Sequence, residues 1–134
     1  MGKDFTIHQI SDREFWAGEN HYLLGDDNIF YATLNGDASD EMGMEIDRMI
    51  NRLLDHIDGP VNLLIDLNRA GKTSSKSRKL FKAFTETSKC RKVALFGMHS
   101  VAMIIASFVM GISKNRNMKF FKERKDALEW LRRE

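Results

Sequence analysis

The 134-residue sequence contains one cysteine and one proline. The single cysteine, Cys90, excludes an internal disulfide framework and suits a reducing compartment. The first ten residues, MGKDFTIHQI, lack the apolar run of a secretory signal, and no repeat or low-complexity tract follows. Hydrophobic residues make up 43% and charged residues 30% of the chain. This composition and length predict one soluble, cytoplasmic domain over residues 1–134.

Patterns that carry catalytic chemistry are also scarce. The four histidines are scattered, and no H-x-x-x-H, C-x-x-C or D-x-D pattern occurs, so we predict no metal site and no cofactor. His99-Ser100 lacks the G-x-S-x-G pattern of an exposed nucleophile, and we interpret Ser100 as a helix cap. Cys90 is interpreted as a structural thiol at a helix end. The sequence therefore predicts a protein that is not an enzyme.

The segment DLNRAGKTSSKS, residues 66–77, partly matches the phosphate-binding pattern G-x-x-x-x-G-K-[ST]. Gly71, Lys72 and Thr73 fall in register, but Asp66 stands where the first glycine belongs. A carboxylate there would face the phosphates, and no later strand ends in the aspartate that such enzymes use. A nucleotide-binding enzyme at 66–73 is kept only as a remote alternative.

Charge is divided unevenly between the two halves of the chain. Residues 1–67 carry 4 Lys+Arg and 14 Asp+Glu, whereas residues 68–134 carry 17 and 5. Residues 68–92 alone hold nine basic side chains and one acidic one. Such a division suggests an anionic partner, which could be a membrane surface, a phosphorylated ligand or an acidic protein. The alternative is that the two halves interleave in the fold and largely neutralise each other.

Hydrophobic periodicity predicts strands that alternate with helices. Ser39 is the expected N-cap of the first helix, because Asp40 and Glu41 follow it and an apolar stripe runs from Met42 to Ile57. The full expected order is a strand at 5–10, a hairpin over 14–36, a helix from 39 to about 57, a strand at 61–66, a loop, a helix at 75–89, a strand at 92–97, a helix at 100–113, a strand at 118–122 and a helix at 123–134. This order predicts a largely parallel central sheet with an antiparallel edge.

The run from Val93 to Ser113 contains no Lys, Arg, Asp or Glu. Gly97-Met98-His99-Ser100 divides it into a short strand and a helix of about fourteen residues, which is too short to span a bilayer of ~30 Å. The helix is nevertheless apolar on nearly every side. We expect it to be covered by neighbouring elements, by a dimer partner, by an apolar ligand or by a membrane surface. Its candidate contact residues are Val101, Ile104, Ile105, Phe108, Val109 and Ile112.

Taken together, these segments resemble the SpoIIAA-like proteins of the STAS superfamily. The resemblance rests on a strand ending LIDL, the KVALFG strand, the apolar helix, and MKFFKERKDALEWL near the C-terminus. It implies an α/β domain with a mixed, mostly parallel sheet, an N-terminal antiparallel hairpin and about four helices packed mainly on one face. It also implies a regulatory or protein-interaction module, similar in architecture to lipid-transfer domains. In anti-sigma-factor antagonists of this superfamily, a serine after the corresponding strand is phosphorylated, and Ser74 and Ser75 lie near that place here.

The leading hypothesis is a non-enzymatic regulatory or ligand-binding module. Helix 100–113 would supply apolar contacts, and the basic segment would contact anionic groups or place the protein peripherally at the membrane, through Lys72, Lys76, Arg78, Lys79 and Lys82. The alternative is a phosphorylation-switched interaction domain that uses Ser74 or Ser75. The partners considered are an anionic lipid or apolar small ligand, a regulatory protein and a second copy of the chain. No nucleic acid is expected, because the aromatic residues have core-like spacing.

Overall fold

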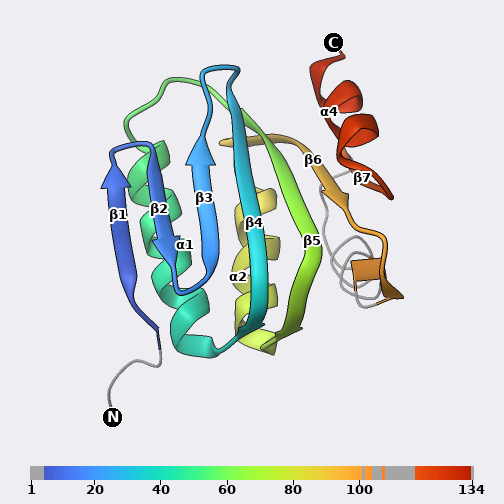
Figure 1. Cartoon of the computed structure of the whole chain (residues 1–134). Coiled ribbons are helices and arrows are strands. Elements are labelled where there is room, and N and C mark those ends of the chain that lie inside the picture. Colours follow the sequence, from blue (N-terminus) through green and yellow to red (C-terminus); the bar gives the residue numbers. More distant parts are fainter. Residues whose placement is uncertain (1–4, 101, 104–106, 108–116, 134) are drawn as a thin grey trace.

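A computed structural model describes residues 5–100, 102–103, 107 and 117–133. One seven-stranded sheet organises the molecule, and its strands lie side by side in chain order (Figure 1). The strands are β1 (Ile7–Ser11), β2 (Glu14–Ala17), β3 (Asn20–Leu24), β4 (Ile29–Ala38), β5 (Val61–Thr73), β6 (Cys90–Phe96) and β7 (Met118–Phe121). The helices with assigned bounds are α1 (Asp40–Leu54), α2 (Ser75–Thr85) and α4 (Arg124–Arg132). Residues 100, 102, 103 and 107 are also helical.

The first half of the sheet is antiparallel and the second half is parallel. Strands β1 to β4 form a meander, whereas β4 to β7 pair in parallel. The predicted single hairpin is therefore wrong, because a second turn at Gly18 and Glu19 separates β2 from β3. Gly18 adopts a φ of 60°, which a residue without a Cβ reaches at no steric cost. The sheet is mixed as expected, but it is not mostly parallel, because it has three parallel and three antiparallel strand pairs among the described residues.

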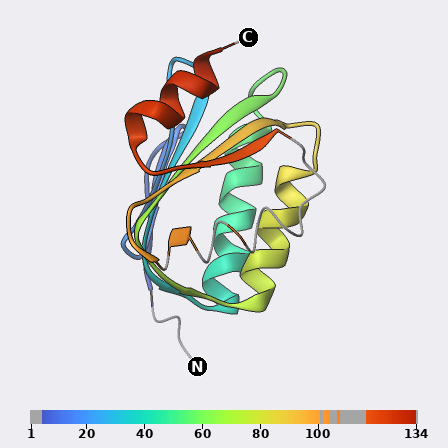
Figure 2. The ribbon, with the colours of Figure 1, turned by 90° about the vertical axis from the view of Figure 1, so that its right-hand side faces the viewer.

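Helices cover both faces of the sheet (Figure 2). Helices α1 and α2 lie on one face. Each connects two neighbouring parallel strands, and the strand order advances in the same direction both times, so right-handed crossovers place both helices on the same side. Helix α4 follows the last strand and is no crossover. It packs on the opposite face, where Ala127 and Leu131 join a cluster with Leu64, Ala94 and Phe96. We predicted about four helices packed mainly on one face. The described part of the chain has three helices with assigned bounds, and they lie on both faces of the sheet.

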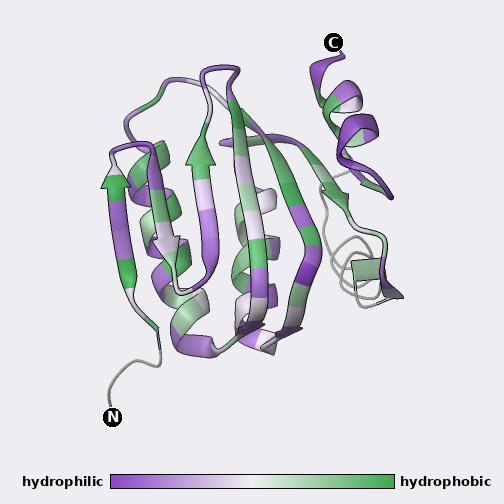
Figure 3. Ribbon diagram, viewed as in Figure 1, coloured by the Kyte–Doolittle hydropathy of each residue, from purple (hydrophilic) through white to green (hydrophobic). Residues whose placement is uncertain are grey.

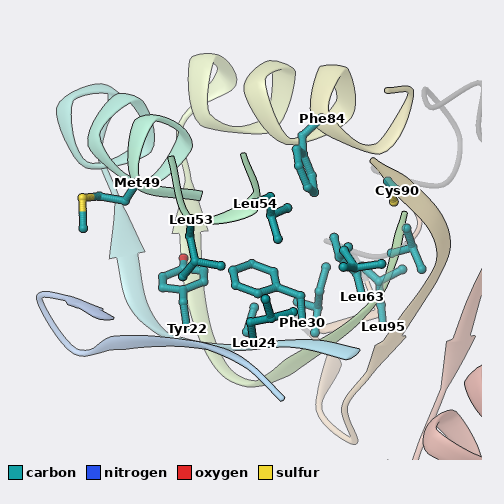
Figure 4. Close-up of a cluster of buried hydrophobic side chains, with 14 of the residues drawn as sticks. Tyr22, Leu24, Phe30, Met49, Leu53, Leu54, Leu63, Phe84, Cys90 and Leu95 are labelled. Atoms are coloured by element: carbon teal, nitrogen blue, oxygen red, sulfur yellow. The ribbon is translucent and has the colours of Figure 1, made fainter. Parts of the chain in front are cut away.

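The larger core lies between the sheet and the α1–α2 layer (Figure 4). Inward residues of β3, β4 and β5 alternate with outward ones, so Tyr22, Phe30 and Leu63 all face the helices. Helix α1 begins as expected, since Ser39 Oγ accepts a hydrogen bond of 3.2 Å from the Met42 N–H. This core fixes α1 and α2 over the centre of the sheet.

Strand β5 is longer than the sequence predicts. The apolar run ends at Asp66, and a loop was expected there, but the strand continues to Thr73 and becomes hydrophilic past its midpoint (Figure 3). Pairing with β4, which has 10 residues and runs to Ala38, explains the extension, because Gly36 lies opposite Ala70 and Ala38 opposite Thr73. The strand neighbour, not local sequence, keeps this polar stretch extended.

Candidate functional site

A cavity of about 120 Å³ lies between strands β3–β6 and the two helices α1 and α2. Its walls are predominantly apolar. The helices contribute Ile46, Ile50, Leu80, Phe81 and Phe84, and the strands contribute Phe30, Ala32, Leu34, Leu63, Ile65, Leu67, Ala70 and Leu95. The helical residues other than Phe84 are half-buried, so the cavity reaches the surface between α1 and α2.

Small side chains create this space. On β4 the inward positions include Ala32, Gly36 and Ala38, and Ala70 stands beside them on β5. Helices α1 and α2 nearly touch near their first turns, where Gly43 meets Ser77. Both residues line the cavity, so the crossing forms one of its ends. The Gly43–Ser77 contact fixes the distance between the helices and the sheet. Because the sheet residues beneath are small, volume between them and the larger helix side chains stays unfilled.

Few polar groups line the cavity, and most of them are occupied. Asn20 donates hydrogen bonds to the Ala17 carbonyl oxygen and Met42 Sδ and accepts one from the Asn35 N–H. Ser77 Oγ donates to the Ser39 carbonyl oxygen at 2.9 Å. These bonds tie the strands and helices to one another. They leave the interior to apolar contact.

Two charged residues also line the cavity. Asp47 of α1 is half-buried, and the resulting desolvation raises the pKa of its carboxyl group. Arg78 of α2 is half-buried too, and its Nη1 donates to the carbonyl oxygen of Thr73, at the end of β5. The cation is thereby held at the strand end of the cavity.

The segment that partly matches a phosphate-binding loop is strand. Gly71, Lys72 and Thr73 belong to β5, and the Lys72 N–H donates to Asp37 Oδ1 at 2.7 Å. A Cβ on Gly71 would lie 2.8 Å from the carbonyl carbon of Gly36, so the glycine serves close strand packing. The residues 66–73 therefore do not form the loop that the remote nucleotide-enzyme alternative needs.

The five predicted cationic residues do not share one environment. Lys72, Lys76 and Lys79 are exposed around the start of α2. Lys82 pairs with Glu86 at 3.5 Å, and Arg78 points to the cavity end. Only the three exposed lysines fit the predicted contact with an anionic surface, which stays a prediction.

The two predicted phosphorylation residues differ in role. Ser74 is the N-cap of α2, where its Oγ accepts a hydrogen bond of 3.1 Å from the Ser77 N–H. Ser75 is the first helical residue and is exposed. Of the two, Ser75 has the hydroxyl that is accessible to another protein.

The apolar contact residues predicted on helix 100–113 lie outside the described residues. They are Val101, Ile104, Ile105, Phe108, Val109 and Ile112. Of their neighbours, Ala102 is fully buried in the larger core, whereas Met103 is 53% exposed. The sequence patterns did not predict the cavity, because its lining comes from several strands and helices and not from one continuous apolar run. The available signal was the series of small residues on β4 and β5.

The acidic and basic halves of the chain do not interleave. Because the strands follow chain order, the acidic half holds β1–β4 and α1, and the basic half holds α2, β6, β7 and α4. The strands of the two halves are therefore not mixed, but the halves still meet, since α1 packs beside α2 and Arg132 pairs with Asp27 at 3.6 Å.

Nucleophilic and metal chemistry find little support in the described part of the chain. Burial raises the pKa of the Cys90 thiol to about 12, which makes it a poor nucleophile. No group of three or more metal-ligating side chains occurs among the residues with assigned positions. None of the helices in the described ranges has the length and apolar character to cross a bilayer.

Comparisons with known proteins bear on the family. The SpoIIAA-like family model matches residues 29–132. No curated protein matches the sequence. One similar solved structure is an uncharacterised protein of the DUF3478 family with a SpoIIAA-like fold from Shewanella loihica PV-4. It is 19% identical over 98% of each chain, with a TM-score of 0.57. The fold is thus shared, and the match to the family model shows that the chain belongs to the SpoIIAA-like family of the STAS superfamily.

Proposed function

We propose that the protein is a non-enzymatic regulatory module that binds a small apolar molecule in the cavity beneath α1 and α2. The observation that carries the proposal is the cavity of about 120 Å³ with walls of Ile, Leu, Phe and Ala. An engineered cavity of ~150 Å³ with a similar lining stays dry and binds benzene. Empty volume of this kind forfeits dispersion contacts that an apolar molecule would restore.

Binding here has a direct structural consequence. An occupant would contact Ile46 and Ile50 of α1, Leu80 and Phe81 of α2, and the sheet together. It would therefore stabilise the packing of both helices and favour one arrangement of the α1–α2 surface. A partner that reads this surface would sense the ligand, which is how a module without catalytic groups regulates.

The test uses methylenecyclohexane as a probe of cavity size and two matched variants. Ile50→Trp places a ring in the cavity, whereas Ile57→Trp changes a half-buried isoleucine of the same core that does not line it. In amide NMR titrations of the full chain, wild type and Ile57→Trp should bind the probe saturably. Ile50→Trp should lose about tenfold in affinity. Absence of saturable binding to wild type would refute the proposal.

A phosphorylation switch at Ser75 is the second candidate. Ser75 is exposed at the first position of α2, with Lys76 beside it and Lys72 and Lys79 exposed nearby. A phosphate there would meet the positive end of the helix dipole and these cations, and it would neutralise most of the local positive charge. Phosphopeptide mapping of the protein from its host should find Ser75 modified and Ser74 unmodified. Modification of neither serine under any growth condition would exclude the switch.

A further inference from the structure

Tyr22 places a hydroxyl group within the apolar layer that holds the cavity. The residue is 3% exposed and lines the cavity from β3. Its ring stacks on Phe15 at 4.8 Å and on Phe30 at 6.1 Å, so its direction is fixed. Figure 4 shows that the hydroxyl points from the sheet toward the helix layer.

No hydrogen bond joins this hydroxyl to any other residue that the structure describes. Burial alone raises the pKa of the Tyr22 phenol, so the group stays protonated at neutral pH and is a donor. The cavity wall thus offers a hydrogen-bond donor to whatever occupies the cavity.

A single water molecule is a poor answer. A buried water typically needs two to four polar partners. The nearest polar side chain on the same strand face, Asn20, already uses its amide nitrogen and oxygen. Ala32 is the strand partner of Tyr22 and offers only a methyl group on this face. A molecule that brings its own apolar body and one acceptor suits the space better.

The donor also lies far from the cationic end of the cavity. Tyr22 pairs with Ala32, whereas Thr73, which binds Arg78, pairs with Ala38. Six residues along β4 correspond to about 15–20 Å. An anionic group beside Tyr22 would therefore be buried without a cation to pair with it, at high cost.

We infer that the ligand is a small, uncharged, mostly apolar compound whose carbonyl oxygen accepts a hydrogen bond from Tyr22. This inference rests on the proposed function and assigns the chemical class of the ligand. Ring walls and aliphatic side chains hold the body, and Tyr22 sets the orientation. The phenol therefore distinguishes a ketone, aldehyde or ester from a hydrocarbon of the same shape.

The experiment compares cyclohexanone with methylenecyclohexane, which replaces the C=O by C=CH₂. Both are titrated by amide NMR into wild type, Tyr22→Phe and Tyr31→Phe. The last is a control, because Tyr31 bonds Asp27 and does not line the cavity. Loss of one neutral hydrogen bond should weaken cyclohexanone about fivefold in Tyr22→Phe. The affinity of methylenecyclohexane for Tyr22→Phe should stay within about twofold of its affinity for wild type. Tyr31→Phe should bind both probes as wild type does.

Each outcome decides something different. If neither probe binds wild type, the proposed function is wrong. If both bind and Tyr22→Phe weakens them equally or not at all, the site stands but the inference is overturned. A second measurement does not depend on the variant: the C=O stretch of cyclohexanone bound to wild type should lie at lower frequency than in hexane. An unshifted stretch would also overturn the inference.

Discussion

Replacing Gly43 by alanine should destabilise the protein, although the same change stabilises most helices. In a helix interior, alanine is favoured over glycine by about 1 kcal/mol. Here a Cβ would meet Ser77 Oγ and would lie 2.8 Å from Ser77 Cβ and 3.0 Å from Ser77 Cα. One of these contacts is with backbone, so a change of rotamer alone does not relieve it.

The size of the effect follows from these distances. Carbon atoms pack best at about 3.5–4.0 Å, so α1 and α2 would have to separate by roughly 0.5–1 Å. Such overpacking costs about 1–3 kcal/mol. After the gain in helix propensity, we expect Gly43→Ala to lower the free energy of unfolding by about 1 kcal/mol, and by at most ~2.

Urea unfolding followed by circular dichroism measures this difference. The double variant Gly43→Ala/Ser77→Gly removes Oγ and Cβ from the contact. Its loss of unfolding free energy should therefore be about 1 kcal/mol smaller than the sum of the losses in the two single variants. Met44→Ala is the control, because Met44 is 49% exposed on the next residue of the same helix and should change stability by under ~0.5 kcal/mol. A Gly43→Ala variant about 1 kcal/mol more stable than wild type, which is the gain in helix propensity alone, would show that α1 and α2 do not cross this closely.

The remaining predictions concern single residues. Ser74→Ala should cost about 1 kcal/mol of unfolding free energy, because the N-cap bond is lost, whereas Ser75→Ala should be nearly neutral in the same urea assay. The thiol of Cys90 should react with iodoacetamide at pH 8 about a thousandfold more slowly in the folded than in the unfolded protein, because burial raises its pKa from 9.0 to about 12; equal rates would contradict its burial. The pKa of Asp27 is lowered. Desolvation by burial raises it, but the hydrogen bond that the Tyr31 hydroxyl donates to its carboxylate outweighs this together with the other hydrogen bonds. The stability from this carboxylate is present above its ordinary value of 3.8 and lost as pH falls below it, so the difference between wild type and Tyr31→Phe should narrow in acid; a pH-independent difference would argue against the bond.

Some of the fold could be predicted because its signals are local. Ser39 followed by acidic residues and an apolar stripe defines the start of α1, and the branched run at 93–96 defines β6. The terminal Ala127 and Leu131 mark the apolar side of α4. In each case, the residues that determine the element lie within a few positions of one another, so periodicity is sufficient. The family resemblance, confirmed by the family model, depends on these same segments.

The sequence by itself determined the kind of chain: an α/β domain without disulfides, with acidic and basic halves, and with strands and helices near their observed places. Only the tertiary structure decided that β5 extends to Thr73, because β4 lies beside it, and that α4 packs on the face opposite α1. It also decided that small residues on β4 and β5 and the contact of Gly43 with Ser77 leave a cavity whose wall includes Tyr22. These features depend on side chains brought together from distant parts of the chain, and no local pattern records how much volume they leave unfilled.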